Sequence, residues 1–270
     1  GTGEIWLRVP ETIRIEINGT LPPNVMSKDV ILRIIGDLTA AGATYRALEF
    51  TGDTVEAMSL SSRMTMANMG IEAGAKCALF APDEKTAEYL GIELTDAERA
   101  LAGDADAPCE KVLRYRAEDF VPVMALPSNV DHVAAIRDLE PVAIDQVFLG
   151  SCTNGRLEDL MAAAEILKGK HIAPFVKLIV TPASRKIWEE AEANGTLATL
   201  SAAGAMITHP SCGLCCGRTG GILSDGERVV ATNNRNFLGR MGSSKVEIYL
   251  ASPKSAAASA LTGKLTEAAC

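Results

Sequence analysis

The chain has 270 residues, of which 47% are hydrophobic and 22% are charged, so it is long enough for about two globular domains. Its formal net charge of −8 excludes the basic surface that nucleic acids or anionic membranes bind, and no apolar run reaches the roughly 18 residues of a membrane span. The first residues lack the basic and apolar regions of a signal peptide. Because the chain also begins without methionine, we expect a processed chain or a piece of a longer protein.

Seven cysteines occur in the chain, an odd number and too few for a disulfide-stabilised fold of this size. We therefore expect a reducing compartment, the cytoplasm, where clustered cysteines indicate metal or redox chemistry. Only three histidines occur, which argues against a histidine-rich zinc enzyme. The isolated Cys77 and Cys109 are expected to be buried, unreactive thiols, and Cys270 to lie in a frayed tail.

The first half of the chain alternates predicted strands and helices. Apolar and polar residues alternate over 12–20, which predicts a half-buried strand that ends in a turn at Asn18-Gly19. Ser27 is the expected cap of a helix over 28–41 that stops at Gly42. Further strands are predicted over 46–50, 77–80 and 122–127, helices over 55–70, 83–90 and 96–101, and a polar loop over 103–108.

The second half continues the same alternation. The predicted strands span 145–150, 175–180, 205–208, 228–232 and 245–250, and the predicted helices span 157–168, 184–194 and 253–261. Strands that alternate with helices are typical of an α/β fold with mostly parallel sheets. We expect a boundary near residue 142, which gives one α/β domain over 23–142 and a second over 143–270 that carries the main cysteine motifs.

Two cysteine-containing loops are the most informative motifs. Gly150-Ser-Cys-Thr-Asn-Gly-Arg156 follows a buried strand and precedes a helix, the position where parallel α/β sheets place ligands. Thr208-His-Pro-Ser-Cys-Gly-Leu-Cys-Cys-Gly-Arg218 places Cys212 and Cys215 three residues apart in a loop bounded by glycines. Together with Cys152 they form a three-thiolate pattern. Such a set would leave one iron of an iron–sulfur cluster open to substrate.

Other interpretations of the same cysteines stay open. Cys212 and Cys215 are alternatively a redox pair, although no thioredoxin-like βαβ unit precedes them. Cys152, Cys212 and Cys215 are alternatively a structural zinc site completed by His209. Cys216 is either a fourth ligand or, as we favour, a spectator, because its side chain must diverge from that of Cys215.

Two further segments carry polar side chains suited to an anionic substrate. Arg235 and Arg240 lie in the loop Ala-Thr-Asn-Asn-Arg-Asn-Phe-Leu-Gly-Arg, and arginine binds carboxylates through paired, charge-assisted hydrogen bonds. Two arginines beside a metal centre indicate a di- or tricarboxylate substrate. Without the cysteine loops nearby, the same arginines would be interpreted as solvated surface residues. Asn68 and Glu72 are four residues apart, so they share one face if their segment is helical; the alternative is an exposed polar face.

Together these motifs resemble the aconitase superfamily, most closely the large subunits of its two-subunit hydro-lyases, 3-isopropylmalate dehydratase and homoaconitase. The resemblance spans about residues 5–261 and its cysteine motifs are highly specific. It is carried by Gly150-Ser-Cys-Thr-Asn, Pro210-Ser-Cys-Gly-Leu-Cys, Asn234-Arg-Asn-Phe-Leu-Gly-Arg240, Ser27-Lys-Asp-Val-Ile-Leu, Asn68-Met-Gly-Ile-Glu-Ala-Gly and Ala81-Pro-Asp-Glu-Lys-Thr86.

The resemblance implies a [4Fe–4S] cluster held by Cys152, Cys212 and Cys215, whose fourth iron is the Lewis acid of a reversible dehydration and rehydration. It implies two three-layer α/β domains of the aconitase iron–sulfur type. It also implies two partners: a small hydroxy di- or tricarboxylic acid as substrate, and a separate small subunit with a swivelling domain, which completes a heterodimer.

The resemblance further implies roles for five polar residues. Asn68 and Asn234 would hydrogen-bond around the cluster, and Glu72 would belong to the acid–base and hydroxyl network. Arg235 and Arg240 would bind the substrate carboxylates.

The chain departs from the family pattern at its N-terminal end, because large subunits of this family are longer. The segment with the Asp-His and Asp-Ser-His-type motifs is absent, as is the swivelling domain with the serine base. We therefore expect the first domain to be largely missing and residues 1–22 to be a strand that remains from it. The chain would hold the cluster ligands and lack much of the acid–base machinery.

The resemblance therefore favours the cluster-bearing large subunit of 3-isopropylmalate dehydratase, an enzyme of leucine biosynthesis. One alternative is the homoaconitase large subunit. Two others belong to different functional classes: a non-catalytic metal-binding or interaction module that retains the fold, and a thiol-redox protein. Loss of an iron–sulfur chromophore in Cys152→Ser would distinguish the first class, zinc without iron the second, and a Cys212–Cys215 disulfide the third.

Overall fold

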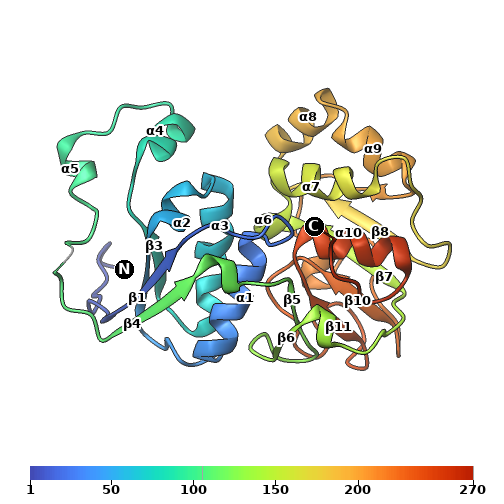
Figure 1. Ribbon diagram of the computed structural model, residues 1–270, viewed down its shortest axis with the longest axis horizontal. Coiled ribbons are helices and arrows are strands. Elements are labelled where there is room, and N and C mark those ends of the chain that lie inside the picture. Colours follow the sequence, from blue (N-terminus) through green and yellow to red (C-terminus); the bar gives the residue numbers. More distant parts are fainter. Residues whose placement is uncertain (105, 270) are drawn as a thin grey trace.

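The structure is a computed structural model that describes residues 1–104 and 106–269, and its two halves lie side by side (Figure 1). The first half is built on a sheet of order β3-β2-β1-β4, in which all neighbouring strands are parallel. Its strands are Thr12–Asn18 (β1), Ala47–Thr51 (β2), Cys77–Phe80 (β3) and Lys111–Arg116 (β4). Cys270, expected in a frayed tail, lies outside the described residues.

The second half is built on a larger sheet of order β6-β5-β11-β10-β7-β8-β9. The pairs that join β6, β5 and β11 are antiparallel and the other four pairs are parallel, which confirms an α/β fold with mostly parallel sheets. Its strands are Val123–Ala125 (β5), Val133–Ala135 (β6), Gln146–Gly150 (β7), Lys177–Thr181 (β8), Met206–Ile207 (β9), Arg228–Ala231 (β10) and Glu247–Leu250 (β11).

The helices connect the strands of both sheets. In the first half they are Ser27–Leu38 (α1), Asp53–Ala57 (α2), Leu60–Met69 (α3), Glu84–Leu90 (α4) and Asp96–Arg99 (α5). In the second half they are Ser151–Asn154 (α6), Leu157–Leu167 (α7), Arg185–Ala193 (α8), Thr196–Ala202 (α9) and Pro253–Thr262 (α10). Short 3₁₀ turns span Gly70–Ala73, Ala117–Asp119, Ile136–Asp138 and Gly213–Cys216. No helix of the described residues is both long and apolar enough to span a membrane.

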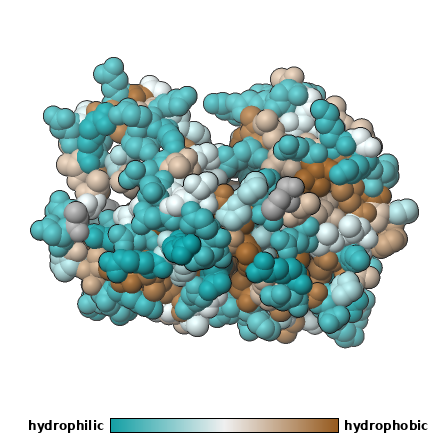
Figure 2. All heavy atoms as spheres, viewed as in Figure 1, coloured by the Kyte–Doolittle hydropathy of each residue, from teal (hydrophilic) through white to brown (hydrophobic). Residues whose placement is uncertain are grey.

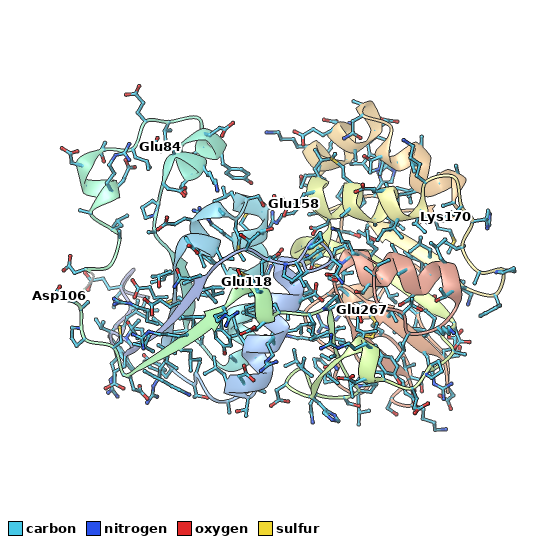
Figure 3. The ribbon with its side chains drawn as sticks, in the orientation of Figure 1. Glu84, Asp106, Glu118, Glu158, Lys170 and Glu267 are labelled. Atoms are coloured by element: carbon cyan, nitrogen blue, oxygen red, sulfur yellow. The ribbon has the colours of Figure 1, made fainter. Side chains whose placement is uncertain are left out.

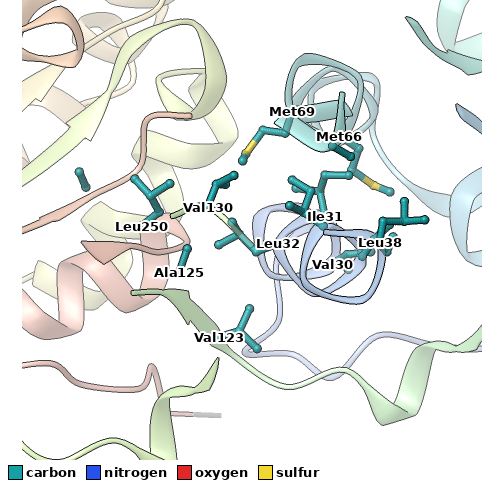
Figure 4. Packing of buried hydrophobic residues seen from close by; sticks show 14 of the residues in the cluster. Val30, Ile31, Leu32, Leu38, Met66, Met69, Val123, Ala125, Val130 and Leu250 are labelled. Carbon is teal, nitrogen blue, oxygen red and sulfur yellow. The ribbon is translucent and has the colours of Figure 1, made fainter. Parts of the chain in front are cut away.

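Helix α1 lies between the two sheets and joins them in one core. Its apolar side chains are all buried, as expected for a helix that packs against other elements on more than one side, while Arg33 and Asp37 are exposed. Figure 4 shows Leu32 of α1 and Met69 of α3 beside Val130 and Leu250 from the second half. The same core continues to the isoleucines of β1, so the inner faces of both sheets belong to one hydrophobic cluster. The opposite face of the second sheet packs against α7 and α10 in a second cluster.

The strand expected to remain from a truncated first domain is an interior strand of the first sheet. Ile15 of β1 lies opposite Phe50 of β2 on one side and Leu113 of β4 on the other. Ile13, Ile15 and Ile17 are buried because alternation along the strand turns all three toward the same face. Residues 12–18 are therefore a structural part of the first half.

The chain passes from the first sheet to the second between Arg116 and Val123, ahead of the boundary expected near residue 142. The reason is that β5 and β6 are short antiparallel strands that extend the second sheet beyond β11. The crossing between the two sheets does not by itself define domains, so the division into domains over 23–142 and 143–270 stays a proposal.

The outer face of the first sheet is lined with charged side chains. Arg14 Nε lies 2.9 Å from Glu49 Oε2, and Arg114 Nε lies 2.7 Å from Glu16 Oε2. Leu101, Gly103 and residues 107–109 lie against part of this face, and Arg14 Nη2 donates to the Asp104 carbonyl oxygen at 3.1 Å. Cys77 is exposed because it lies on this face, and Cys109 is half-buried, so the prediction that both are buried is wrong.

Local signals explain where other predicted elements differ. Ser27 is the first residue of α1 and not its cap; the Asp29 carboxylate accepts a hydrogen bond from the Met26 N–H at 2.8 Å instead. The helix predicted over 55–70 is interrupted because Ser59 caps a new helix by accepting from the Ser62 N–H. The strands β4 and β6 and the helix α9 were not predicted.

An open groove of about 520 Å³ runs along the junction of the two halves, which the space-filling view shows as a hollow (Figure 2). Glu158 of α7 lies at this junction (Figure 3). It accepts hydrogen bonds from Ser59 Oγ at 2.5 Å and Ser62 Oγ at 2.8 Å, so α7 is linked directly to the start of α3.

Candidate functional site

The three motif loops leave the carboxyl ends of parallel strands at the same edge of the second sheet. Cys152 follows β7, the loop of Cys212 and Cys215 follows β9, and the loop over 232–240 follows β10. Strand β7 lies between β10 and β8, and β8 pairs with β9. The topology therefore brings the three loops to one side, which is where open α/β sheets bind ligands.

A sharp turn at Gly150 directs the chain from β7 into the Cys152 loop. Gly150 has φ of +135°, and a Cβ there would lie 2.0 Å from the Thr181 carbonyl oxygen on the neighbouring strand. Only glycine fits this position, on both conformation and space. The next residue, Ser151, also has a positive φ of +65°, so the backbone stays in a rarely populated region just before Cys152.

An amide network joins the Cys152 loop to the loop after β10 and to α3. The side-chain amide of Asn234 donates to Asn68 Oδ1 at 2.6 Å, and Asn68 Nδ2 lies 3.5 Å from Cys152 Sγ. Thr153 Oγ1 donates to Asn234 Oδ1. The structure thus brings together three predicted site residues, Asn68, Cys152 and Asn234. Thr153 is a participant that sequence reasoning missed, although it lies beside the predicted cysteine.

The remaining predicted polar residues form two further contacts. Arg235 Nε donates to Glu72 Oε1 at 2.8 Å, which links the loop after β10 to the turn after α3. Arg240 Nε donates to the Cys215 carbonyl oxygen at 2.6 Å, and Arg240 Nη2 lies 3.8 Å from Cys215 Sγ. The Arg240 guanidinium also lies 5.4 Å from the centre of the Phe237 ring. Each arginine is therefore held in place by protein groups before any substrate binds.

The cysteine thiols share this edge but are not gathered around one point. All six described cysteines are free thiols; Cys152 and Cys212 are exposed, and Cys215 and Cys216 are half-buried. Across residues 1–104 and 106–269, no three cysteine, histidine or carboxylate side chains stand close enough to hold a metal ion. Cys216 Sγ donates to the Gly213 carbonyl oxygen at 3.5 Å. The ring of His209 stacks on Trp188, with centroids 6.2 Å apart.

The chemistry of this edge fits an anionic iron–sulfur cluster even though the thiols are not gathered. Thiolates from two loops are the donors that such clusters use. Four buried polar atoms near these loops have no hydrogen-bond partner in the described structure: Ser151 Oγ, Asn154 Oδ1, Arg156 Nε and Asn233 Oδ1. Unpartnered buried polar atoms are rare in folded proteins, and their concentration here indicates a site shaped for a bound group.

The base of the Cys152 loop is held by a buried carboxyl group. Asp159 accepts hydrogen bonds from Asn154 Nδ2 and from the Arg156 N–H, both at 3.0 Å. Burial raises the pKa of Asp159 to about 7. Arg156 Nη2 in turn donates to the Cys152 carbonyl oxygen at 3.2 Å. These contacts restrain the backbone from Cys152 to Arg156.

Comparison with known proteins identifies the family of the chain. The sequence profile of the Aconitase family (aconitate hydratase) matches residues 1–142 and 132–263. The chain belongs to the aconitase family.

Individual members of the aconitase family give a closer comparison. The chain is 49% identical over 266 residues to 3-isopropylmalate dehydratase large subunit 1 of Methanopyrus kandleri. It is 47% identical to large subunit 2 of the same enzyme from Archaeoglobus fulgidus and to large subunit 1 from Pyrococcus furiosus. In each case the match covers 98% of this chain and 63–64% of the relative, so the chain spans under two thirds of their length.

Among solved structures, the crystal structure of Thermococcus kodakaraensis aconitase X (holo-form) aligns with 88% of this chain and 53% of that chain. The sequence identity is 14% and the TM-score is 0.46.

Proposed function

We propose that this chain is the cluster-bearing part of the large subunit of 3-isopropylmalate dehydratase, a hydro-lyase of leucine biosynthesis. The observation that carries the proposal is the amide network in which Asn68 Nδ2 lies 3.5 Å from Cys152 Sγ and Asn68 Oδ1 accepts a hydrogen bond from Asn234. The 49% identity to a 3-isopropylmalate dehydratase large subunit supports the choice of enzyme within the aconitase family. The homoaconitase large subunit is the alternative within the same reaction class.

In this proposal Cys152, Cys212 and Cys215 hold a [4Fe–4S] cluster. When bound, such a cluster supplies an open iron that polarises the substrate hydroxyl as a Lewis acid. Asn68 and Asn234 then donate hydrogen bonds around the thiolate of Cys152. Both cysteine loops leave the same edge of the sheet, which supports a group held between them.

The arginines bind and orient a substrate with more than one carboxylate. Arg235 donates from Nε to Glu72, which leaves the two terminal nitrogens of its guanidinium for a substrate carboxylate. Arg240 is fixed by the Cys215 carbonyl and presents its charge beside the same thiol. Glu72, held by Arg235, accepts a hydrogen bond from the substrate hydroxyl and so orients it. The hydroxyl gains a proton and leaves as water, while the proton of the neighbouring carbon passes to a base that the small subunit or the rest of the large subunit supplies. Together Glu72 and the two arginines orient the hydroxyl that leaves one carbon and returns to its neighbour through an alkene.

The full reaction in this proposal needs further protein groups. We propose a separate small subunit with a swivelling domain as the partner, because the relatives are named large subunits. A cytoplasmic location is also proposed, since the six described cysteines are free thiols, as is usual in a reducing compartment.

Anaerobic reconstitution with iron and sulfide tests the cluster. We expect the 270-residue chain to develop a broad brown absorbance and to retain close to four irons per chain, and Cys152→Ser to lose both. Cys77→Ser is the matched control, because Cys77 is an exposed thiol on the opposite half of the molecule. Its spectrum should equal that of the wild type.

Other outcomes would overturn the proposal. Bound zinc without iron would support a non-catalytic metal-binding module, and a reversible Cys212–Cys215 disulfide that forms without Cys152 would support a thiol-redox protein. If the cluster forms, calorimetric titration of the reconstituted chain with 3-isopropylmalate and with homoisocitrate distinguishes the two dehydratases by which acid binds more tightly.

A further inference from the structure

Lys28 on the first turn of α1 is a fully buried lysine. Its side chain has 0% exposure, and its Nζ donates to the carbonyl oxygens of Thr232 at 2.9 Å and Asn233 at 2.7 Å. In the part of the chain that the structure describes, no carboxylate oxygen lies within 4 Å of this nitrogen. Burying an ammonium without a carboxylate partner in contact is unfavourable for folding. The two carbonyl hydrogen bonds, and the charges of Asp159, Glu72 and Asp29 farther away, offset part of that cost.

The two carbonyls that Lys28 binds lie at the start of the loop that carries the predicted substrate residues. Thr232 connects this loop to the cysteine loop, because its Oγ1 accepts a hydrogen bond from the Gly150 N–H at 2.9 Å. Asn234 and Arg235 follow directly and make the contacts to Asn68 and Glu72. One ammonium group in the first half of the molecule thus fixes the backbone from which both side chains of the second half extend.

The charge of Lys28 also lies close to the cysteine loops. Burial lowers the pKa of Lys28 to about 7, and the electrostatic influence of Cys215 is the largest that opposes this fall. A three-thiolate iron–sulfur cluster is anionic, so a buried cation beside it would compensate charge that water cannot reach.

We propose that Lys28 is a positioning residue whose buried ammonium fixes the loop of Asn234 and Arg235 and supplies the positive charge that faces the cluster. The positioning part stands on the hydrogen bonds alone. The charge part rests on the proposed function, since it requires the cluster.

Hydrogen exchange in the metal-free chain tests the positioning part. In Lys28→Met, which removes the donor and the charge at similar length, we expect the amides of Thr232 and Gly150 to exchange at least tenfold faster. The amide of Val229, inside β10, should keep its wild-type rate. Lys85→Met is the matched control, because the half-buried Lys85 also donates from Nζ to two carbonyl oxygens, those of Glu56 and Met58, away from the loop of Asn234. Unchanged exchange at Thr232 and Gly150 in Lys28→Met would overturn the positioning role.

The reduction potential of the reconstituted cluster tests the charge part. Removing a nearby cation disfavours added negative charge, so Lys28→Met should make reduction at least tenfold less favourable, which is 59 mV more negative for one electron. Lys28→Gln keeps a shorter, neutral donor. Compared with Lys28→Met, it should therefore restore part of the protection of the Thr232 and Gly150 amides, but its reduction potential should stay as negative. An unchanged potential in both variants would overturn the charge role, because a purely structural residue would leave it unaltered.

The outcomes separate this inference from the proposed function. If the wild-type chain takes up no iron, the proposed function and the charge role both fail, and the exchange measurement still decides the positioning role. If Lys28→Met does not fold, Lys28→Gln carries both measurements.

Discussion

Asp159 is the residue whose environment most clearly links the site to the stability of the chain. Burial raises the pKa of Asp159 from 3.8 to about 7. Between about pH 4 and pH 7 the folded chain therefore keeps a proton on this carboxyl group that the unfolded chain has released. This contribution to stability is complete below about pH 4 and is lost as the pH rises through 7.

We therefore expect Asp159→Asn to flatten the pH dependence of stability. Between pH 5 and pH 8 the free energy of unfolding of the wild type should fall by on the order of 2 kcal/mol more than that of the variant. The new amide should be tolerated, because Asn154 Oδ1 has no partner and can turn to accept from it. Urea unfolding at the two pH values measures the difference. Glu165→Gln, exposed on the same helix, is the control, and equal slopes in wild type and Asp159→Asn would contradict the prediction.

The candidate site residues that sequence could predict are those in short, chemically distinctive motifs. Cys152, Asn68 and Asn234 were named from such motifs, and the structure joins them by hydrogen bonds. Lys28 was quoted as part of a family segment and given no role. Its partners are backbone carbonyls about 200 positions away, and backbone groups leave no signature in side-chain sequence.

At the scale of elements, the end of β7 depends on one glycine. Gly150→Ala would bring a Cβ to 2.0 Å from the Thr181 carbonyl oxygen at a φ of +135°. We expect a loss of about 3 kcal/mol or more in the free energy of unfolding, measured by urea denaturation. The control is Gly169→Ala, where φ is also positive, +71°, and the new Cβ would meet nothing within 4 Å. It should cost about 1 kcal/mol. Equal losses of unfolding free energy in Gly150→Ala and Gly169→Ala would mean that position 150 requires glycine for its backbone conformation alone and not for the close contact with β8.

The strands and helices that sequence predicted are those with strong local patterns. The buried runs of β7 and β8 and the alternation of β1 were recognised from composition and period. Strand β4 was missed because it is an edge strand that reads Lys-Val-Leu-Arg-Tyr-Arg, and only Leu113 and Tyr115 turn toward the core. Its position follows from pairing with β1, a tertiary contact that a local pattern does not contain.

At the scale of the whole molecule, one core joins the two halves. The isoleucines of β1, the helix α1 and the inner face of the second sheet pack in the same hydrophobic cluster. Breaking either half would expose the apolar face of the other, so neither half is expected to unfold alone.

We therefore expect a single unfolding transition in urea. Far-UV circular dichroism reports on both halves, and the fluorescence of Trp188 reports on α8 in the second half; Trp6 is 86% exposed and should contribute little change. The two probes should give the same midpoint within experimental error. Two separated midpoints would show that the halves are independent in spite of their common core. The single exposed-site substitution Trp6→Phe removes the minor signal and serves as the control.

The contacts of Asn68 with Asn234 and of Glu72 with Arg235 cross from one half of the molecule to the other. A ligand that binds these side chains therefore contacts both halves of the molecule. Its binding free energy then also stabilises the halves against separation. Because such a ligand binds only the folded chain, its binding raises the melting temperature. The size of that rise can therefore rank candidate acids by affinity before any turnover is measured.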